Sequence, residues 1–145
     1  MPGFLGIFLF VLRNLMKIKQ PYIVFFCLNI KMKKTTIYPL LKSSLEFTSY
    51  VVNFTKSLEQ NDRSPIAKKL LDASIKINTY LYEAKTAIRE ADILQKMSKA
   101  KESAEETIYW FQQCVKSNYF DNDPFFVRRG NRLIDNIESS TSISE

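Results

Sequence analysis

The sequence contains no histidine, only three glycines and only two cysteines among its 145 residues. Without histidine the chain lacks the usual general base near neutral pH, the commonest metal ligand and any Ser-His or Cys-His nucleophile pair. The cysteines, Cys27 and Cys114, lie far apart, with neither zinc-ligand spacing nor the further pairs of a disulfide scaffold. We therefore expect no cofactor, no metal site and no enzymatic activity, in a reduced, cytoplasmic chain whose Cys114 packs in the core.

Glycine and proline are also scarce. Three glycines and five prolines are too few for the many tight turns of a β-sandwich. Hydrophobic residues make up 46% and charged residues 25% of the chain, which is typical of a globular domain rather than a disordered one. The length suits one domain with a single core, and the composition favours an all-α fold.

The net charge of +6 is concentrated near the N-terminus. Residues 1–31 contain four basic residues and no acidic one, whereas the remainder contains 17 basic and 15 acidic residues. Two apolar runs, 4–12 and 22–28, are each shorter than the about 20 residues of a membrane helix, and no signal-peptide pattern surrounds them. We predict that residues 1–35 are an extension outside the domain. A mis-assigned start is the preferred explanation, with the true start at Met32; a membrane-associating hairpin and an extra structural element are the alternatives.

From residue 36 onward, apolar residues recur at helical spacing. The first segment covers 39–58 and begins with Pro39, whose missing N–H costs nothing in a first helical turn. Its predicted core residues are Leu41, Leu45, Tyr50, Val51, Phe54 and Leu58. The second segment begins with Ser64 as N-cap and Pro65 at the first helical position. Its predicted core residues are Ile66, Leu70, Ala73, Ile77, Tyr80 or Leu81, and Ala84.

The third segment is the most regular and begins near Asp92, where Asp92 or one of its neighbours is a candidate cap. Its predicted core residues are Ile93, Met97, Ala100, Ala104, Thr107, Phe111 and Cys114. The fourth begins with Asp123 as N-cap and Pro124, and Gly130 inside it indicates close approach of a neighbouring helix. Its predicted core residues are Phe126, Val127, Leu133, Ile134 and Ile137. Short loops favour antiparallel neighbours, so we predict an all-α, up-down-up-down four-helix bundle over 36–138 and a disordered tail over 139–145.

Motifs in the second and third segments resemble those of a known family. They are Ser74-Ile75 followed by Glu83-Ala84, then Asp92-Ile-Leu-Gln-Lys96, then Glu106-Thr107-Ile108-Tyr109-Trp110-Phe111. Over about residues 37–138 the chain resembles the bacterial four helix bundle proteins, also called ribosomal-RNA intervening-sequence proteins. The resemblance implies a bundle that assembles as a homopentameric ring and has no established enzymatic activity. Accessory variability proteins of diversity-generating retroelements, a related group, bind reverse transcriptase and RNA, so both are partners that the resemblance implies.

Three sets of residues are candidates for function. We interpret Glu83, Lys96 and Glu106 as a structural polar network rather than a catalytic acid–base pair, because no nucleophile or metal-ligand set accompanies them. Tyr109, Trp110 and Phe111 follow one another at steps of about 100° on one helix, so they cannot all face one core. Phe111 continues the core stripe, and we interpret Tyr109 and Trp110 as an oligomer interface, with the flank of the bundle or ordinary core packing as the alternatives. The third set consists of basic side chains: Lys68, Lys69, Arg128, Arg129 and Arg132. They form either a solvated surface or a nucleic-acid-binding patch, which an oligomeric ring would repeat in each subunit.

Two functions remain open at this point. The first is a non-enzymatic, homo-oligomeric interaction protein that serves as an RNA or ribonucleoprotein accessory. The alternative is a purely structural or protein-partner-binding bundle without affinity for nucleic acid. We expect no small-molecule substrate and no membrane attachment.

Overall fold

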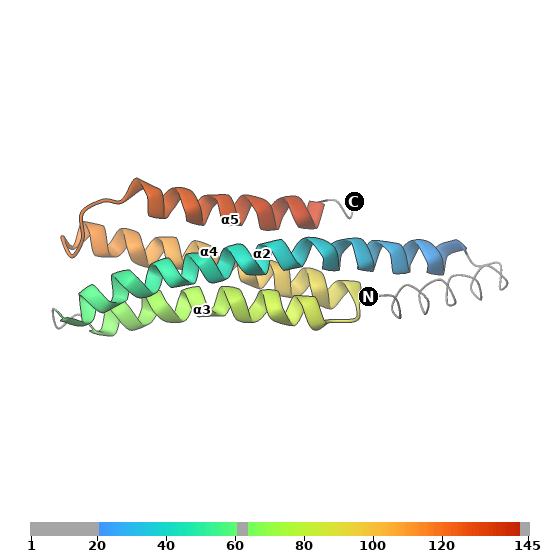
Figure 1. Cartoon of the computed structure of the whole chain (residues 1–145), viewed down its shortest axis with the longest axis horizontal. Helices are drawn as coiled ribbons and strands as arrows, with labels where there is room; N and C mark the ends of the chain where they lie inside the picture. Colours follow the sequence, from blue (N-terminus) through green and yellow to red (C-terminus); the bar gives the residue numbers. More distant parts are fainter. Residues whose placement is uncertain (1–20, 61–63, 143–145) are drawn as a thin grey trace.

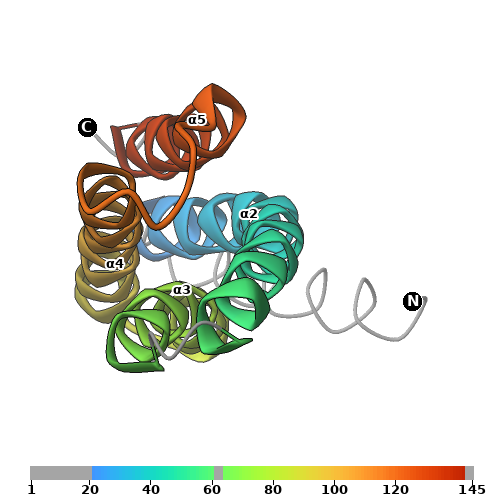
Figure 2. The same cartoon turned by 90° about the vertical axis from the view of Figure 1, so that its left-hand side faces the viewer.

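The protein folds as four helices that pack lengthwise (Figure 1). The computed structural model describes residues 21–60 and 64–142, with side chains described for 36–60 and 65–142. The helices are α2 (Pro21–Gln60), α3 (Ser64–Thr86), α4 (Glu90–Lys116) and α5 (Pro124–Ser142). Consecutive helices run in opposite directions, and each packs against two neighbours, so that α2, α3, α4 and α5 close a four-sided bundle (Figures 1 and 2). The predicted all-α four-helix bundle is confirmed.

Helix α2 begins much earlier than the sequence pattern indicated. We expected the first helix to start at Pro39, but this residue lies inside a continuous helix of 40 residues. Pro39 is exposed, and its neighbours Ile37 and Leu40 are buried, so packing on both sides of the proline holds the helix across the missing hydrogen bond. Residues 21–35, which we assigned to an extension, form the part of α2 that projects past the other helices (Figure 1). Residues 1–20 lie outside the described part.

The buried face of α2 differs from the predicted one. Val51 and Leu58 are buried as expected, but Leu45 is 54% exposed and Leu41, Tyr50 and Phe54 are only partly buried. The residues that fill the core from α2 are Ile37, Leu40, Ser44, Phe47, Val51, Thr55 and Leu58. Ser44 and Thr55 donate to carbonyl oxygens of their own helix, those of Leu41 (2.8 Å) and Val52 (2.9 Å). These bonds allow two polar residues on the core face, which is why the polarity pattern misled the prediction.

Helices α3 and α4 match the predicted core closely. Every residue of the predicted α4 stripe is buried, including Cys114, and so are Leu70, Ala73, Ile77 and Ala84 of α3. Leu81 rather than Tyr80 is the core residue between them, and Ile66 is partly buried. Small buried residues on the two helices let them approach closely, and they are Ala67, Ala73, Ser74, Ala84, Ala100, Ser103 and Ala104. The predicted cap at Asp92 is wrong: α4 begins at Glu90, and Asp92 binds the guanidinium of Arg89 instead (2.8 Å).

Helix α5 begins as predicted. The Asp123 carboxylate accepts a hydrogen bond from the backbone N–H of Phe125 (2.9 Å), and Pro124 occupies the first helical position. The buried residues of α5 are Phe126, Gly130, Leu133 and Ile137, while Val127 and Ile134 are partly buried. The helix continues to Ser142, so the predicted tail is helical up to that residue, and 143–145 lie outside the described part. No helix in the described part is long and apolar enough to span a membrane.

Gly130 lets α4 and α5 approach, as the sequence indicated. A Cβ atom at this position would lie 2.7 Å from both Cγ1 and Cδ1 of Ile108 on α4. We expect Gly130→Ala to destabilise the protein by about 1 kcal/mol, because overpacking against a stiff β-branched side chain exceeds the gain in helix propensity. In an Ile108→Ala background, which removes both atoms, Gly130→Ala is expected to raise the free energy of unfolding. Urea denaturation of the four proteins checks this, and an equal effect in both backgrounds would contradict the close approach.

Candidate functional site

The start of α5 is anchored to α2 by a short polar chain. The Tyr50 hydroxyl donates to Asp123 Oδ2 (2.5 Å), while Asp123 Oδ1 caps α5. The guanidinium of Arg129 lies 5.2 Å from the centroid of the Tyr50 ring, a cation–π distance. Asp123 thus fixes both the first turn of α5 and its orientation on α2. The hydrogen bond to Asp123, together with burial, raises the pKa of Tyr50 above its usual value.

A cluster of aromatic rings inside the same end of the bundle packs α5 against α2 and α4. Phe126 is fully buried and stacks on Phe111 of α4 with ring centroids 3.9 Å apart. It also contacts Phe47 and Phe54 of α2, at 5.1 and 5.4 Å between centroids. Because Phe126 is fixed from two helices, the residues beside it on α5 are held in a defined direction. Phe125 on its N-terminal side is 54% exposed.

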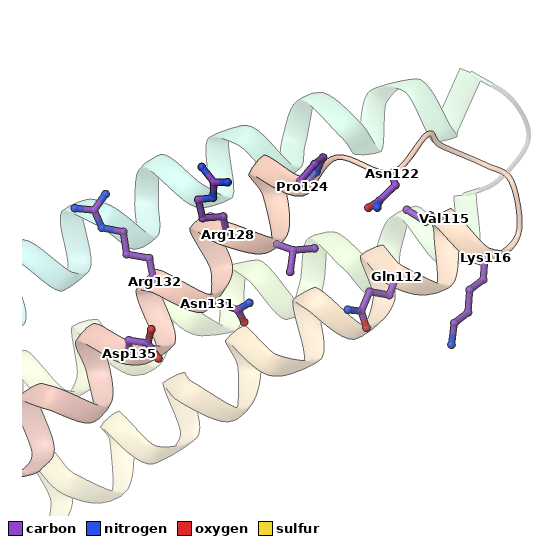
Figure 3. Close-up of a pocket in the computed structure, with 10 residues that line it drawn as sticks. Gln112, Val115, Lys116, Asn122, Pro124, Arg128, Asn131, Arg132 and Asp135 are labelled. Atoms are coloured by element: carbon purple, nitrogen blue, oxygen red, sulfur yellow. The ribbon is translucent and has the colours of Figure 1, made fainter.

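Arg128, Arg129 and Arg132 all lie exposed on the N-terminal half of α5. Arg128 and Arg132 border a groove of 940 Å³ between α4 and α5 (Figure 3). The groove is also lined by Gln112, Val115, Lys116, Asn122, Pro124, Val127, Asn131 and Asp135. On the other side of α5, Arg129 and Arg132 line a smaller hollow of 340 Å³ against α2, together with Glu46. The three arginines therefore form one surface, which we call the α5 arginine face.

Within the described part of the chain, the arginines of this face have no acidic partner of their own. Among the described residues, no carboxylate lies within 4.0 Å of the guanidinium of Arg128, Arg129 or Arg132, although Asp135 and Glu46 line the adjoining hollows. Arg89, by contrast, is paired with Asp92. The charges of the α5 arginine face are consequently available for an anionic ligand.

The predicted lysines do not join this face. Lys68 and Lys69 lie near the start of α3, the helix diagonally opposite α5, and both are exposed. The ammonium of Lys69 lies 4.4 Å from the centroid of the Trp110 ring on α4. The structure thus brings the three arginines together and places the two lysines on another side of the bundle. Lys116 of α4 also lines the groove, with its ammonium end directed away from α5 (Figure 3).

The predicted polar network is only partly assembled. Lys96 Nζ lies 2.5 Å from Glu83 Oε2 and joins α4 to α3, but Glu106 instead accepts a long hydrogen bond from the Trp110 indole (3.4 Å). The side chains of Lys96 and Glu83 are 30% and 41% exposed, so we expect a small contribution to stability. Ser103 donates to the Lys99 carbonyl (2.9 Å) and adds nothing to the pair.

Tyr109 lies outside the core, whereas Trp110 is partly buried and packs against the core. Tyr109 is 52% exposed, and its ring meets that of Trp110 edge-on with centroids 5.1 Å apart. Trp110 is partly buried under Lys69. The pair therefore forms an aromatic patch on α4 in which Tyr109 is the exposed member. Its role in an oligomer stays a prediction.

Three groups make stability sensitive to alkaline pH. Hydrogen bonds to Glu83 and Glu138 raise the pKa of Lys96 and Lys101 above 10.5, and the bond to Asp123 raises the pKa of Tyr50 above 10.0. Each stabilising contribution is complete below the unfolded-state pKa and is lost as pH rises through the folded-state pKa. We expect the melting temperature to fall above about pH 10, and to fall less steeply in the Tyr50→Phe, Lys96→Met, Lys101→Met triple variant. If the melting temperatures of the natural protein and the triple variant fell equally steeply with pH, these three groups would not be the cause of the pH dependence.

The described helices define an antiparallel four-helix bundle protein with an exposed arginine face on its last helix. A family model described as 23S rRNA-intervening sequence protein matches residues 38–138. The chain belongs to this family.

A solved structure supports the same relationship. The fold is similar to that of a protein of unknown function from the S23 ribosomal protein family of Bacteroides thetaiotaomicron, with a TM-score of 0.64 and 25% identity. The similarity covers 74% of this chain and 96% of that protein. No functionally curated protein matches the chain.

Proposed function

We propose that this protein is a non-enzymatic, homo-oligomeric RNA accessory protein whose α5 arginine face binds RNA phosphates. The observation that carries the proposal is the exposure of Arg128, Arg129 and Arg132 on one side of a fixed helix without a carboxylate partner among the described residues. Guanidinium groups bind phosphate through paired N–H donors and release counterions on binding. The family description, which refers to an intervening sequence of 23S rRNA, agrees with RNA as the partner.

Self-association would strengthen a modest patch. The net charge of +6 is small for a nucleic-acid-binding chain, and much of it lies before residue 32. An oligomer repeats the α5 arginine face in each subunit, so that several weak contacts act together on one RNA. The patch of Tyr109 and Trp110 provides an exposed aromatic surface of the kind enriched at subunit contacts. We propose it as the oligomer interface, with a ring as the form that repeats the face, and light scattering of Tyr109→Ser against the natural protein as its test.

Charge reversal tests the RNA function. We expect the Arg128→Glu, Arg129→Glu, Arg132→Glu variant to bind structured 23S rRNA fragments at least about tenfold more weakly, with a salt slope shallower by about 2, since three phosphate contacts are lost. The matched control reverses three exposed lysines elsewhere, Lys42, Lys56 and Lys76, and is expected to retain most of the affinity. Fluorescence anisotropy over a salt series measures both. Equal losses in the two variants would mean that only net charge matters and would refute a defined face.

A protein partner is the second candidate. Apolar side chains lie exposed along the outer side of α2 and α3: Tyr38 (63%), Leu45 (54%), Ile75 (45%) and Tyr82 (57%). The two helices are joined there, because Asn78 donates to Thr48 (2.8 Å) and Lys85 approaches the Tyr38 ring (5.6 Å). Such a row suits a protein contact rather than nucleic acid. Failure of the natural protein to bind RNA at low salt would leave this function as the preferred one.

A further inference from the structure

We infer that the α5 arginine face takes unpaired RNA, with a base stacked on Phe125 and an extruded nucleotide in the groove between α4 and α5. This inference rests on the proposed RNA function and names the form of RNA that the site accepts. Its starting point is the position of Phe125. The ring is 54% exposed on the first turn of α5, between the arginines and the loop that precedes the helix.

Phe125 lies within a pair of guanidinium groups. Arg128 and Arg129 follow it by three and four residues, which places all three side chains on one side of the helix. The guanidinium carbons lie 6.0 Å (Arg128) and 5.5 Å (Arg129) from the centroid of the Phe125 ring. A base that stacks on the exposed part of this ring would have its flanking phosphates beside both cations. An aromatic ring framed by cations is the arrangement that proteins use for single-stranded nucleic acid.

The groove between α4 and α5, which Arg128 borders, suits a single nucleotide. Its volume of 940 Å³ lies within the range of small-ligand sites, and it opens next to Pro124, which precedes Phe125. Gln112 projects from α4 and Asn131 from α5 into the space between these helices (Figure 3), and Asn122 closes one end. Each amide offers both a donor and an acceptor, so together they match the edge of a base or a 2′-hydroxyl. Asp135 adds an acceptor for an exocyclic amino group.

Duplex RNA fits this site poorly. In an A-form helix the bases are stacked on one another and the major groove is too deep and narrow for side chains. In such a duplex no base is free to stack on the Phe125 ring or to enter the groove between α4 and α5, which leaves contacts to phosphates and to the edges of the shallow minor groove. The features of the site beyond its charge therefore favour loops, bulges and single-stranded ends.

The test compares unpaired and paired RNA on the full chain. Fluorescence anisotropy is measured with a short unstructured RNA and with a duplex of the same length, for the natural protein and for Phe125→Leu. The matched control is Tyr82→Leu, an exposed aromatic on α3 that is 57% exposed. We expect Phe125→Leu to lose affinity for the unpaired RNA by on the order of tenfold, as for other base–aromatic stacks, and to keep its affinity for the duplex. Circular dichroism confirms that each variant is folded.

The possible outcomes distinguish a failure of this inference from a failure of the proposed RNA function. If the natural protein binds duplex as tightly as unpaired RNA, or if Phe125→Leu weakens both equally or neither, the inference is overturned. The RNA function still stands in that case, provided that the arginine reversal weakens binding. If the natural protein binds neither RNA at low salt, the proposed function itself fails.

Discussion

Phe126→Ala is expected to lower the free energy of unfolding by about 3–5 kcal/mol, the usual range for removing a buried phenylalanine from a packed core. Phe126 is fully buried, stacks on Phe111 with an interplanar angle of 13°, and contacts three further rings of α2: Phe47, Tyr50 and Phe54. The side chain is the main apolar anchor of the first two turns of α5. Its loss leaves a cavity bordered by rings from two helices, which cannot collapse without moving α5.

Urea denaturation followed by circular dichroism measures this effect. The adjacent residue provides the control, because Phe125 carries the same side chain in an exposed position. Phe125→Ala is expected to change stability by less than about 0.5 kcal/mol. A loss of similar size for the two variants would show that the aromatic cluster does not hold α5.

Asp123→Ala is expected to destabilise the protein by about 2–3 kcal/mol. The change removes the N-cap of α5, which contributes about 0.5–2 kcal/mol, and the charged acceptor of the Tyr50 hydroxyl, which contributes about 1.5–3 kcal/mol when well shielded. Tyr50 is only partly buried, so the sum lies below the combined upper limits. Both interactions involve the first turn of α5, so their removal detaches the start of this helix from α2.

A double-mutant cycle with Tyr50→Phe separates the two contributions. We expect Tyr50→Phe to lower the free energy of unfolding clearly less in the Asp123→Ala background than in the natural protein, because the hydrogen bond is already absent in that background. Asp123→Asn retains a capping oxygen and is expected to fall between the natural protein and Asp123→Ala. Additive effects in the cycle would mean that the Tyr50–Asp123 bond contributes nothing to stability.

The sequence correctly predicts those parts of the fold in which a single physical rule determines the structure. The α4 stripe was fully predictable because its apolar and small residues follow a single helical period from Ile93 to Cys114. The start of α5 was predictable because Asp123 and Pro124 each satisfy a requirement of a helix N-terminus. Gly130 was correctly read as a close approach, since few other roles explain a glycine within a helix.

The sequence pattern predicts helix α2 incorrectly because two rules compete there. Pro39 suits a helix start, yet tertiary packing of Ile37 and Leu40 carries the helix through it. Ser44 and Thr55 occupy core positions, so the polar residues on the first helix pointed to the wrong face. Local preference alone could not resolve either case.

The candidate site was only half predictable for a similar reason. The arginines of α5 share a helix, so their proximity follows from spacing, and Phe125 could have been added to them by the same rule. The groove depends on which helices are neighbours, and for that reason Lys116 and Gln112 of α4 escaped notice. Lys68 and Lys69 were grouped with the arginines by charge alone, and the bundle separates them.

Photo-crosslinking of bound RNA, followed by mass spectrometry of the linked peptides, tests most directly whether RNA lies on the last helix. The expected result is crosslinks in the segment that spans the end of α4 and the first half of α5, from about Gln112 to Asp135, with Phe125 among the linked residues. Crosslinks confined to the outer side of α2 and α3, around Leu45 and Tyr82, would place RNA on the wrong side of the bundle and contradict the proposed function of the α5 arginine face.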